Sequence, residues 1–214
     1  MTGCPGLGTA TRPCPPRAGA LWRWAWRTFS RHPLMAAIPL IGGVAVVSAQ
    51  WLANAALAGG TADLVSIFST FVIIALTITV CDWAALRAAL PGDPRWTKRI
   101  LPLQPVRTAL LTILLVPGYI VVFVVGFVVL LFIALFFFQA APVACMEGRG
   151  GVRSSLGVSF RTMQDAGGVA ALCVVLWCLA WVLGVTIIGP LLLMPAASLM
   201  TTGLYLSLTG RPIA

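Results

Sequence analysis

The chain has 214 residues, of which 60% are hydrophobic and only 9% are charged, whereas a soluble domain has roughly 25% charged residues. This composition excludes a cytosolic enzyme, a secreted disulfide scaffold and a disordered tail, and it predicts an all-α polytopic integral membrane protein. The formal net charge is +9. Because the basic residues flank apolar runs, we expect them to face anionic lipid headgroups, and we expect no nucleic acid as a partner.

The amino-terminal part divides into a tail and an interfacial helix. Residues 1–20 are rich in Pro and lack an apolar core, which predicts a flexible cytoplasmic tail and no secretory signal. Residues 21–214 form a single predicted membrane domain. It begins with an amphipathic helix over Leu21–Arg31 that we expect to lie in the inner membrane surface. Basic residues recur every four positions on one face of this helix, Trp22, Trp26 and Phe29 cover another, and Trp24 lies between them; the residues expected at the membrane interface are Trp22, Trp24, Trp26, Arg23, Arg27 and Arg31.

Apolar stretches of about 20 residues, the length that crosses a bilayer, predict the transmembrane helices that follow. The stretch Val106–Ala141 is too long for one crossing, and Pro117-Gly118 supplies a break within it. Dividing it there places every basic cluster on the cytoplasmic side, as expected for short Arg-rich loops. We therefore expect six transmembrane helices in the inner membrane of a bacterium, with both termini cytoplasmic and spans near residues 34–57, 64–86, 100–116, 119–145, 168–188 and 190–208.

A second interfacial helix is expected after the fourth span. There Val152, Leu156, Phe160 and Met163 are spaced four, four and three residues apart, which gives a narrow apolar stripe. The basic residues of this segment lie off the stripe. The segment is therefore predicted to rest on the membrane surface.

Asp82 is the acidic residue inside a predicted span. A carboxylate in a membrane is costly unless it is paired or functional. Because Asp82 is predicted to lie about one turn from the cytoplasmic end of its span, it either forms an interfacial ion pair with Arg87 or contacts a substrate, an ion or a proton. Glu147 follows the fourth span, where it is expected to cap the next helix or to pair with the nearby Arg149 and Arg153.

Few other polar residues fall within spans. Gln50 and Asn54 share a face of the first span, and Gln139 lies in the fourth. These amides either form hydrogen bonds between helices or line a polar path that also includes Asp82.

No motif for catalysis or nucleotide binding occurs in the sequence, and we predict no catalytic residue, metal site or cofactor. The six cysteines show no pattern of exported disulfides. One group of metal-ligand and acid–base residue types is predicted near the inner membrane face, although its spacing fits no zinc pattern: Cys81, Asp82, Cys145, Glu147 and His32.

The carboxyl-terminal half carries a family resemblance. The stretch from Ala141 to Gly148, the following segment with Ser155, Ser159 and Arg161, two apolar spans and the final Leu204-Tyr205-Leu206 are the features concerned. They resemble the membrane domain attached to some bacterial glycerophosphoryl diester phosphodiesterases and its stand-alone six-helix relatives. The resemblance implies a six-helix architecture in the plasma membrane, and it implies no activity, because the phosphodiesterase chemistry belongs to a separate soluble domain.

We therefore expect a non-enzymatic membrane protein that acts as an accessory or scaffold subunit, or in transport or self-protection at the bacterial envelope. Its expected partners are anionic lipids and a membrane protein or a second copy of the chain. One alternative is a small permease or exporter with a polar path through Gln50, Asn54, Asp82 and Gln139. Another is an intramembrane enzyme of lipid or peptide modification that uses the Cys, Asp and Glu residues near the inner face.

Overall fold

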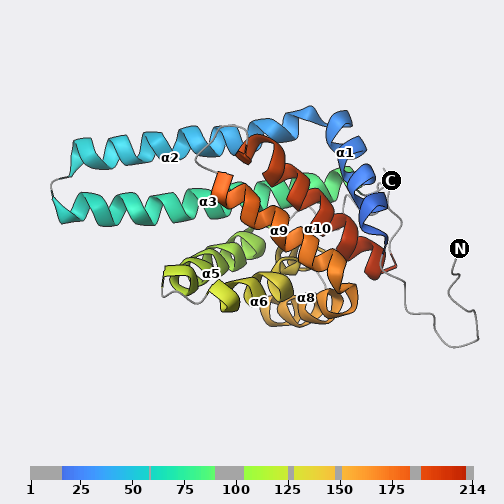
Figure 1. Ribbon diagram of the computed structural model, residues 1–214. Helices are drawn as coiled ribbons and strands as arrows, with labels where there is room; N and C mark the ends of the chain where they lie inside the picture. Colours follow the sequence, from blue (N-terminus) through green and yellow to red (C-terminus); the bar gives the residue numbers. More distant parts are fainter. Residues whose placement is uncertain are drawn as a thin grey trace, which may run out of the picture.

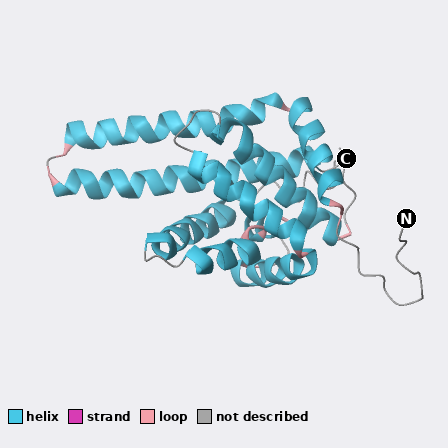
Figure 2. Ribbon diagram, in the orientation of Figure 1, coloured by secondary structure: helices cyan, strands magenta, loops and turns pink. Residues whose placement is uncertain are grey.

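The structure, a computed structural model, describes residues 16–57, 59–89, 104–124, 128–147, 151–183 and 189–210. Within these ranges every regular element is a helix, as Figure 2 shows by colour. The predicted all-α fold is therefore confirmed for the described part of the chain. The helix α1 (Ala18–Arg31) begins inside the predicted tail, and the rest of that tail, residues 1–15, lies outside the described residues.

A long helical hairpin is the most extended feature of the molecule. A short 3₁₀ turn, η1 (Pro33–Ala36), leads into α2 (Ala37–Ala56), and α3 (Gly60–Ala89) returns along it. Gly59, with a φ of +62°, makes the reversal between the helices. The two helices lie side by side and project beyond the other helices in Figure 1. Close approach is possible because Gly42 of α2 lies directly against Thr77 of α3.

The last helix, α10 (Met194–Leu208), lies at the centre of the bundle. Its residues from Pro195 to Leu206 are all buried, and it packs against α1, α3 and α9 (Gly168–Val182). Gly203 allows α1 to approach, since a Cβ built on it would lie 2.9 Å from a ring carbon of Trp24 and 2.9 Å from a methyl carbon of Leu21. The helix is preceded by a π-helical turn, η3 (Gly189–Leu193).

The remaining helices cover the other side of α3. They are α5 (Gln104–Val124), α6 (Val128–Phe138), α7 (Ala141–Met146) and α8 (Val152–Ala166). Helix α5 packs against α3, while α7 lies between α5 and α8, and α6 packs on α8 (Figure 1).

The predicted break at Pro117-Gly118 is wrong, because α5 stays helical through both residues. A membrane helix tolerates a proline where neighbouring groups satisfy the one carbonyl that it frees. Helix α5 instead ends at Val124 and α6 begins at Val128. A further break, at Gln139–Ala140, lies inside the predicted fourth span, and Pro142 stands at the start of α7. A proline suits the first helical positions, where its missing N–H removes no bond within its own helix.

Helix lengths support a membrane protein. Three helical segments are long and apolar enough to cross a bilayer, namely Pro33–Ala56, Gly60–Ala89 and Leu191–Leu208. A fourth is added if α8 and the start of α9, bent by 112°, count as one span. The described apolar segments of the predicted third and fourth spans, Val106–Gly118 and Phe132–Met146, are shorter. These helix lengths therefore support three or four crossings and do not establish the predicted six.

Helix α8 turns a different face inward from the one predicted. Its buried face consists of Ser155, Ser159, Thr162, Met163 and Ala166, and the Ser159 hydroxyl donates a 2.7 Å hydrogen bond to the carbonyl of Phe137. From the predicted apolar stripe, only Met163 is buried, and Phe160 is exposed and stacks on Phe137. Small hydroxyl residues let α8 pack closely on α6 and α7, and this outweighs the burial of larger apolar side chains.

Candidate functional site

A partly open cavity of about 50 Å³ lies where α3, α5, α9 and the break between α6 and α7 meet. A volume of this kind holds about three to five waters, or one small ion with some of its water. Most of its walls are apolar, and polar groups reach it from Asp82, Thr112, Gln139 and Trp177. The other lining residues are Ile78, Leu115, Val116, Leu135, Phe138 and Pro142.

Asp82 supplies the acidic group of this cavity. It is only 2% exposed, and α3 continues for about two more turns to Ala89. The Ser198 hydroxyl of α10 faces its carboxyl group. Arg87, the predicted ion-pair partner, is exposed and places its guanidinium 5.0 Å from the ring centre of Trp83 instead. Asp82 is therefore enclosed by protein and does not pair with Arg87, while its depth in the membrane stays a prediction.

Gln139 is held in a fixed orientation at the edge of the cavity. Its side-chain nitrogen donates a 3.1 Å hydrogen bond to the carbonyl of Ala170 on α9 and approaches the sulfur of Met163 at 3.5 Å. Because the amide nitrogen faces a carbonyl, exchanging the amide oxygen and nitrogen would place two acceptors together. The amide oxygen, Oε1, is buried and has no hydrogen-bond donor within the described residues.

The break between α6 and α7 lies beside the same cavity. The last turn of α6, at Leu135 and Phe138, lines the cavity, and the carboxyl end of a helix carries partial negative charge. Pro142, which also lines the cavity, has no N–H to donate to the carbonyl of Phe138 four residues earlier. Membrane transporters use interrupted helices of this kind to bring backbone carbonyls to an ion or a substrate.

A buried polar stripe on α10 was missed by the sequence reading. It consists of Ser198, Thr201, Thr202 and Tyr205, all of them 0–1% exposed. Their spacing of three, four and seven residues from Ser198 places them on one side of a helix, and this was the available signal. Thr201 accepts a 3.3 Å hydrogen bond from the indole nitrogen of Trp177, so the stripe supports one wall of the cavity.

Glu147 contacts the carboxyl-terminal end of this stripe, at Tyr205. It stands at the end of α7, and its carboxyl group accepts a 2.8 Å hydrogen bond from the Tyr205 hydroxyl. Tyr205 is fully buried. Helix α8 has Gly151 as its N-cap residue, and Arg149 lies outside the described residues. The sequence reading expected Glu147 to act at the start of α8, whereas the structure ties it to α10, 58 residues away.

The predicted polar path is not assembled as proposed. Asp82 and Gln139 line one cavity, but Gln50 and Asn54 are exposed on the projecting part of α2. Gln50 donates a 3.3 Å hydrogen bond to the Thr70 hydroxyl of α3. Since Thr70 precedes Asp82 by twelve residues on the same helix, Gln50 lies about 18 Å along α3 from the cavity. Asn54, one turn closer to the tip of the hairpin, lies farther away.

Helix α1 has both exposed residues and residues buried against the bundle among those predicted to lie at the membrane interface. Its four buried residues, Leu21, Ala25, Thr28 and Phe29, face the bundle. Trp24 is partly buried against α10. The exposed remainder comprises Trp22, Trp26, Arg23, Arg27 and Arg31, with the rings of Trp22 and Trp26 stacked 6.4 Å apart.

The predicted inner-face group of metal-ligand types does not form a ligand cluster in the described part of the chain, where no group of three or more His, Cys, Asp or Glu side chains is arranged to hold a metal. Cys81 and Cys145 are buried and free, and His32 ends α1 as an exposed residue. Cys4 and Cys14 lie outside the described residues.

Comparison with protein families, curated proteins and solved structures finds no match to this chain.

Proposed function

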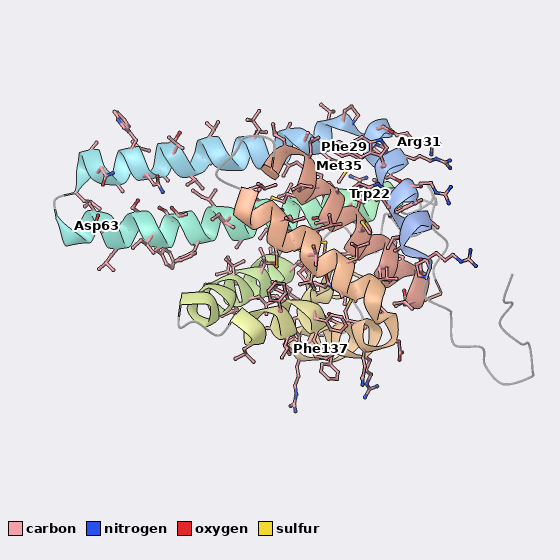
Figure 3. All side chains as sticks on the ribbon, in the orientation of Figure 1. Trp22, Phe29, Arg31, Met35, Asp63 and Phe137 are labelled. Carbon is pink, nitrogen blue, oxygen red and sulfur yellow. The ribbon has the colours of Figure 1, made fainter. Side chains whose placement is uncertain are left out.

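We propose that the chain is an inner-membrane protein with six crossings and with both termini on the cytoplasmic side. The distribution of charge supports this topology. Between Arg31 and Arg87 the sequence contains no Lys or Arg. Figure 3 shows Trp22 and Arg31 at one end of the molecule and Asp63, in the first turn of α3, at the other. An Arg-rich end and an end without basic residues are typical of a protein oriented by the positive-inside rule.

Paired cysteine labelling tests this topology in intact cells. Asp63→Cys places a thiol at the exposed start of α3, and Ser154→Cys places one on the exposed surface of α8. A membrane-impermeant maleimide added outside is expected to label the Asp63→Cys protein and not the Ser154→Cys protein until the cells are opened. Labelling of Ser154→Cys from outside contradicts the topology.

Within that topology we propose transport of a small solute, in the manner of a small permease. The observation that carries this proposal is the cavity at a helix break, which is lined by an enclosed carboxyl group and by an amide whose oxygen has no donor among the described residues. Ionisable groups inside membrane bundles usually mark pathways for substrates or ions. The polar path of this proposal includes Asp82, Thr112 and Gln139 and excludes Gln50 and Asn54.

Reconstituted protein provides the test. Proteoliposomes are adsorbed to a solid-supported membrane and exposed to rapid jumps of amino acids, amines, short peptides or inorganic ions. We expect a transient current for at least one class with the wild-type protein, its loss in Asp82→Asn, and wild-type currents in Asn54→Ala, which alters a polar residue outside the cavity. Wild-type protein that gives no current with any class, or Asp82→Asn with full currents, refutes the permease.

A second candidate is an accessory or scaffold subunit, and the projecting hairpin favours it. Large apolar side chains cover both helices outside the bundle, including Trp51 at 70% exposure and Phe68 at 69%. A photo-crosslinking residue at Trp51 in living cells is expected to give one defined protein adduct if the hairpin holds a partner or a second copy. Adducts with lipid alone contradict this role.

The exposed face of α1 is proposed to bind anionic lipids. Arg23, Arg27 and Arg31 are exposed beside the stacked rings of Trp22 and Trp26. Guanidinium groups and indole rings both favour the headgroup layer. The relationship to the membrane domain of phosphodiesterases also stays a proposal, and it rests on the sequence features of the carboxyl-terminal half.

A further inference from the structure

We infer that the cavity at Asp82 is a binding site for a small monovalent cation of the size of Na⁺, which the protein uses as its coupling ion. This inference rests on the proposed permease function because it names an ion for the same cavity. Charge balance, the donor set and the size of the cavity each lead to it.

An enclosed carboxyl group such as that of Asp82 is neutralised either by a proton or by a nearby cation. The described lining of the cavity contains one carboxyl group and no Lys, Arg or His. The nearest basic residue along α3, Arg87, lies over Trp83 at the protein surface. An ionised carboxyl group enclosed to this extent is strongly unfavourable unless a cation accompanies it. A bound cation supplies that charge without a basic side chain.

The donor set consists of oxygen atoms. Gln139, which lines the cavity, has a buried Oε1 that receives no hydrogen bond within the described residues. The Thr112 hydroxyl donates to Thr108 of its own helix at 2.9 Å, which leaves its oxygen lone pairs directed elsewhere. Oxygen ligands suit hard cations. The carboxyl end of α6 adds partial negative charge from the backbone.

The charge and size of the site select a monovalent ion. Protein sites for Ca²⁺ combine several carboxylates and six to eight oxygen ligands, whereas the described lining contributes a single carboxylate. A cavity of about 50 Å³ admits a small ion with a few waters and excludes a larger organic cation. The ring of Trp177 forms part of the wall, and an aromatic face also attracts a cation.

The test uses the purified full-length chain and Na⁺ as the probe. Binding of radioactive ²²Na⁺ is measured in choline chloride buffer, together with the thermal unfolding of the protein in NaCl and in choline chloride of equal ionic strength. We expect ²²Na⁺ to bind, unlabelled Na⁺ to displace it, and NaCl to raise the unfolding temperature. Asp82→Asn is expected to weaken binding by about a hundredfold or more, the usual scale for deleting one member of a buried charge pair.

Two further variants keep the result interpretable. Asp63→Asn makes the same chemical change on the same helix at an exposed position, and it is expected to bind ²²Na⁺ like the wild type. Thr112→Val replaces a cavity hydroxyl by a methyl group of similar size, and it is expected to weaken binding by about tenfold, which is the factor for 1.4 kcal/mol. It provides a second measurement if Asp82→Asn does not fold.

Three outcomes overturn the inference. They are no ²²Na⁺ binding by the wild type, full binding by Asp82→Asn, and an infrared spectrum in NaCl that shows Asp82 neutralised by a proton. The outcomes for the permease differ. If solute currents persist in Na⁺-free buffer and ²²Na⁺ does not bind, the permease proposal stands and the cation site is refuted. If ²²Na⁺ binds and no solute gives a current, the cation site stands and the permease proposal is refuted.

Discussion

The hydrogen bond between Tyr205 and Glu147 is expected to be one of the strongest single links between the two parts of the bundle. It joins α10 to the end of α7 over 2.8 Å, and Tyr205 is fully buried. Tyr205→Phe removes the hydroxyl and keeps the ring, so the substitution leaves almost no cavity. Its cost is therefore that of the bond itself.

A hydrogen bond to a charged group contributes about 1.5–3 kcal/mol. For a chain of this length, 1 kcal/mol corresponds to about 2–4 °C in unfolding temperature. We therefore expect Tyr205→Phe to lower the free energy of unfolding by about 2 kcal/mol and the unfolding temperature by roughly 4–8 °C. The assay is unfolding in detergent with increasing sodium dodecyl sulfate, followed by circular dichroism, and by thermal unfolding of the same samples.

The matched control is Ser207→Ala, which removes a hydroxyl that donates to Gly203 of its own helix at 2.8 Å. We expect this change to cost less than about 0.5 kcal/mol. A double-mutant cycle with Glu147→Gln is expected to give a coupling energy above about 1 kcal/mol. An additive cycle, or a loss with Tyr205→Phe no larger than that of the control, refutes the reasoning.

Three further predictions concern helix contacts and lipid. Gly42→Ala is expected to lower the free energy of unfolding by about 1–3 kcal/mol, because a Cβ there meets a side chain of α3, whereas Gly43→Ala faces open space and is expected to cost nothing; equal effects in sodium dodecyl sulfate titrations contradict this. Gly203→Leu is expected to push α1 off α10 and to raise amide exchange in α1 at least about tenfold by mass spectrometry, and unchanged exchange argues against the contact seen here. Arg27→Gln is expected to reduce the phosphatidylglycerol that copurifies with the protein, and lipid analysis showing wild-type retention contradicts lipid binding at α1.

The position of the cavity was only partly predictable. Asp82 could be singled out because an acidic residue among apolar neighbours is costly in a membrane. Gln139 could be identified as a polar residue of a span, but nothing in its neighbourhood indicated that it would meet Asp82 and that Gln50 would not. Residue spacing shows which side chains share a helix face, and it does not show which face of another helix they meet.

Proline positions show the same limit. Pro117 and Pro142 both interrupt apolar stretches in the sequence, yet Pro117 lies inside α5 and Pro142 starts α7. A proline removes one donor in either place. Whether the chain breaks there depends on what surrounds the freed carbonyl, and that is a property of the packed bundle.

The sequence by itself determined the helical class and the expectation of a membrane environment, because apolar stretches without charge can satisfy their backbone in lipid only as helices. It also predicted the hairpin, since its two expected spans, 34–57 and 64–86, lie within the helical segments Pro33–Ala56 and Gly60–Ala89 to within one residue. Only the tertiary structure decided that α10 is central and that Tyr205 binds Glu147. Contacts between residues far apart in the chain depend on which helices pack against one another. Local sequence patterns do not determine this packing, because the helices have similar apolar surfaces.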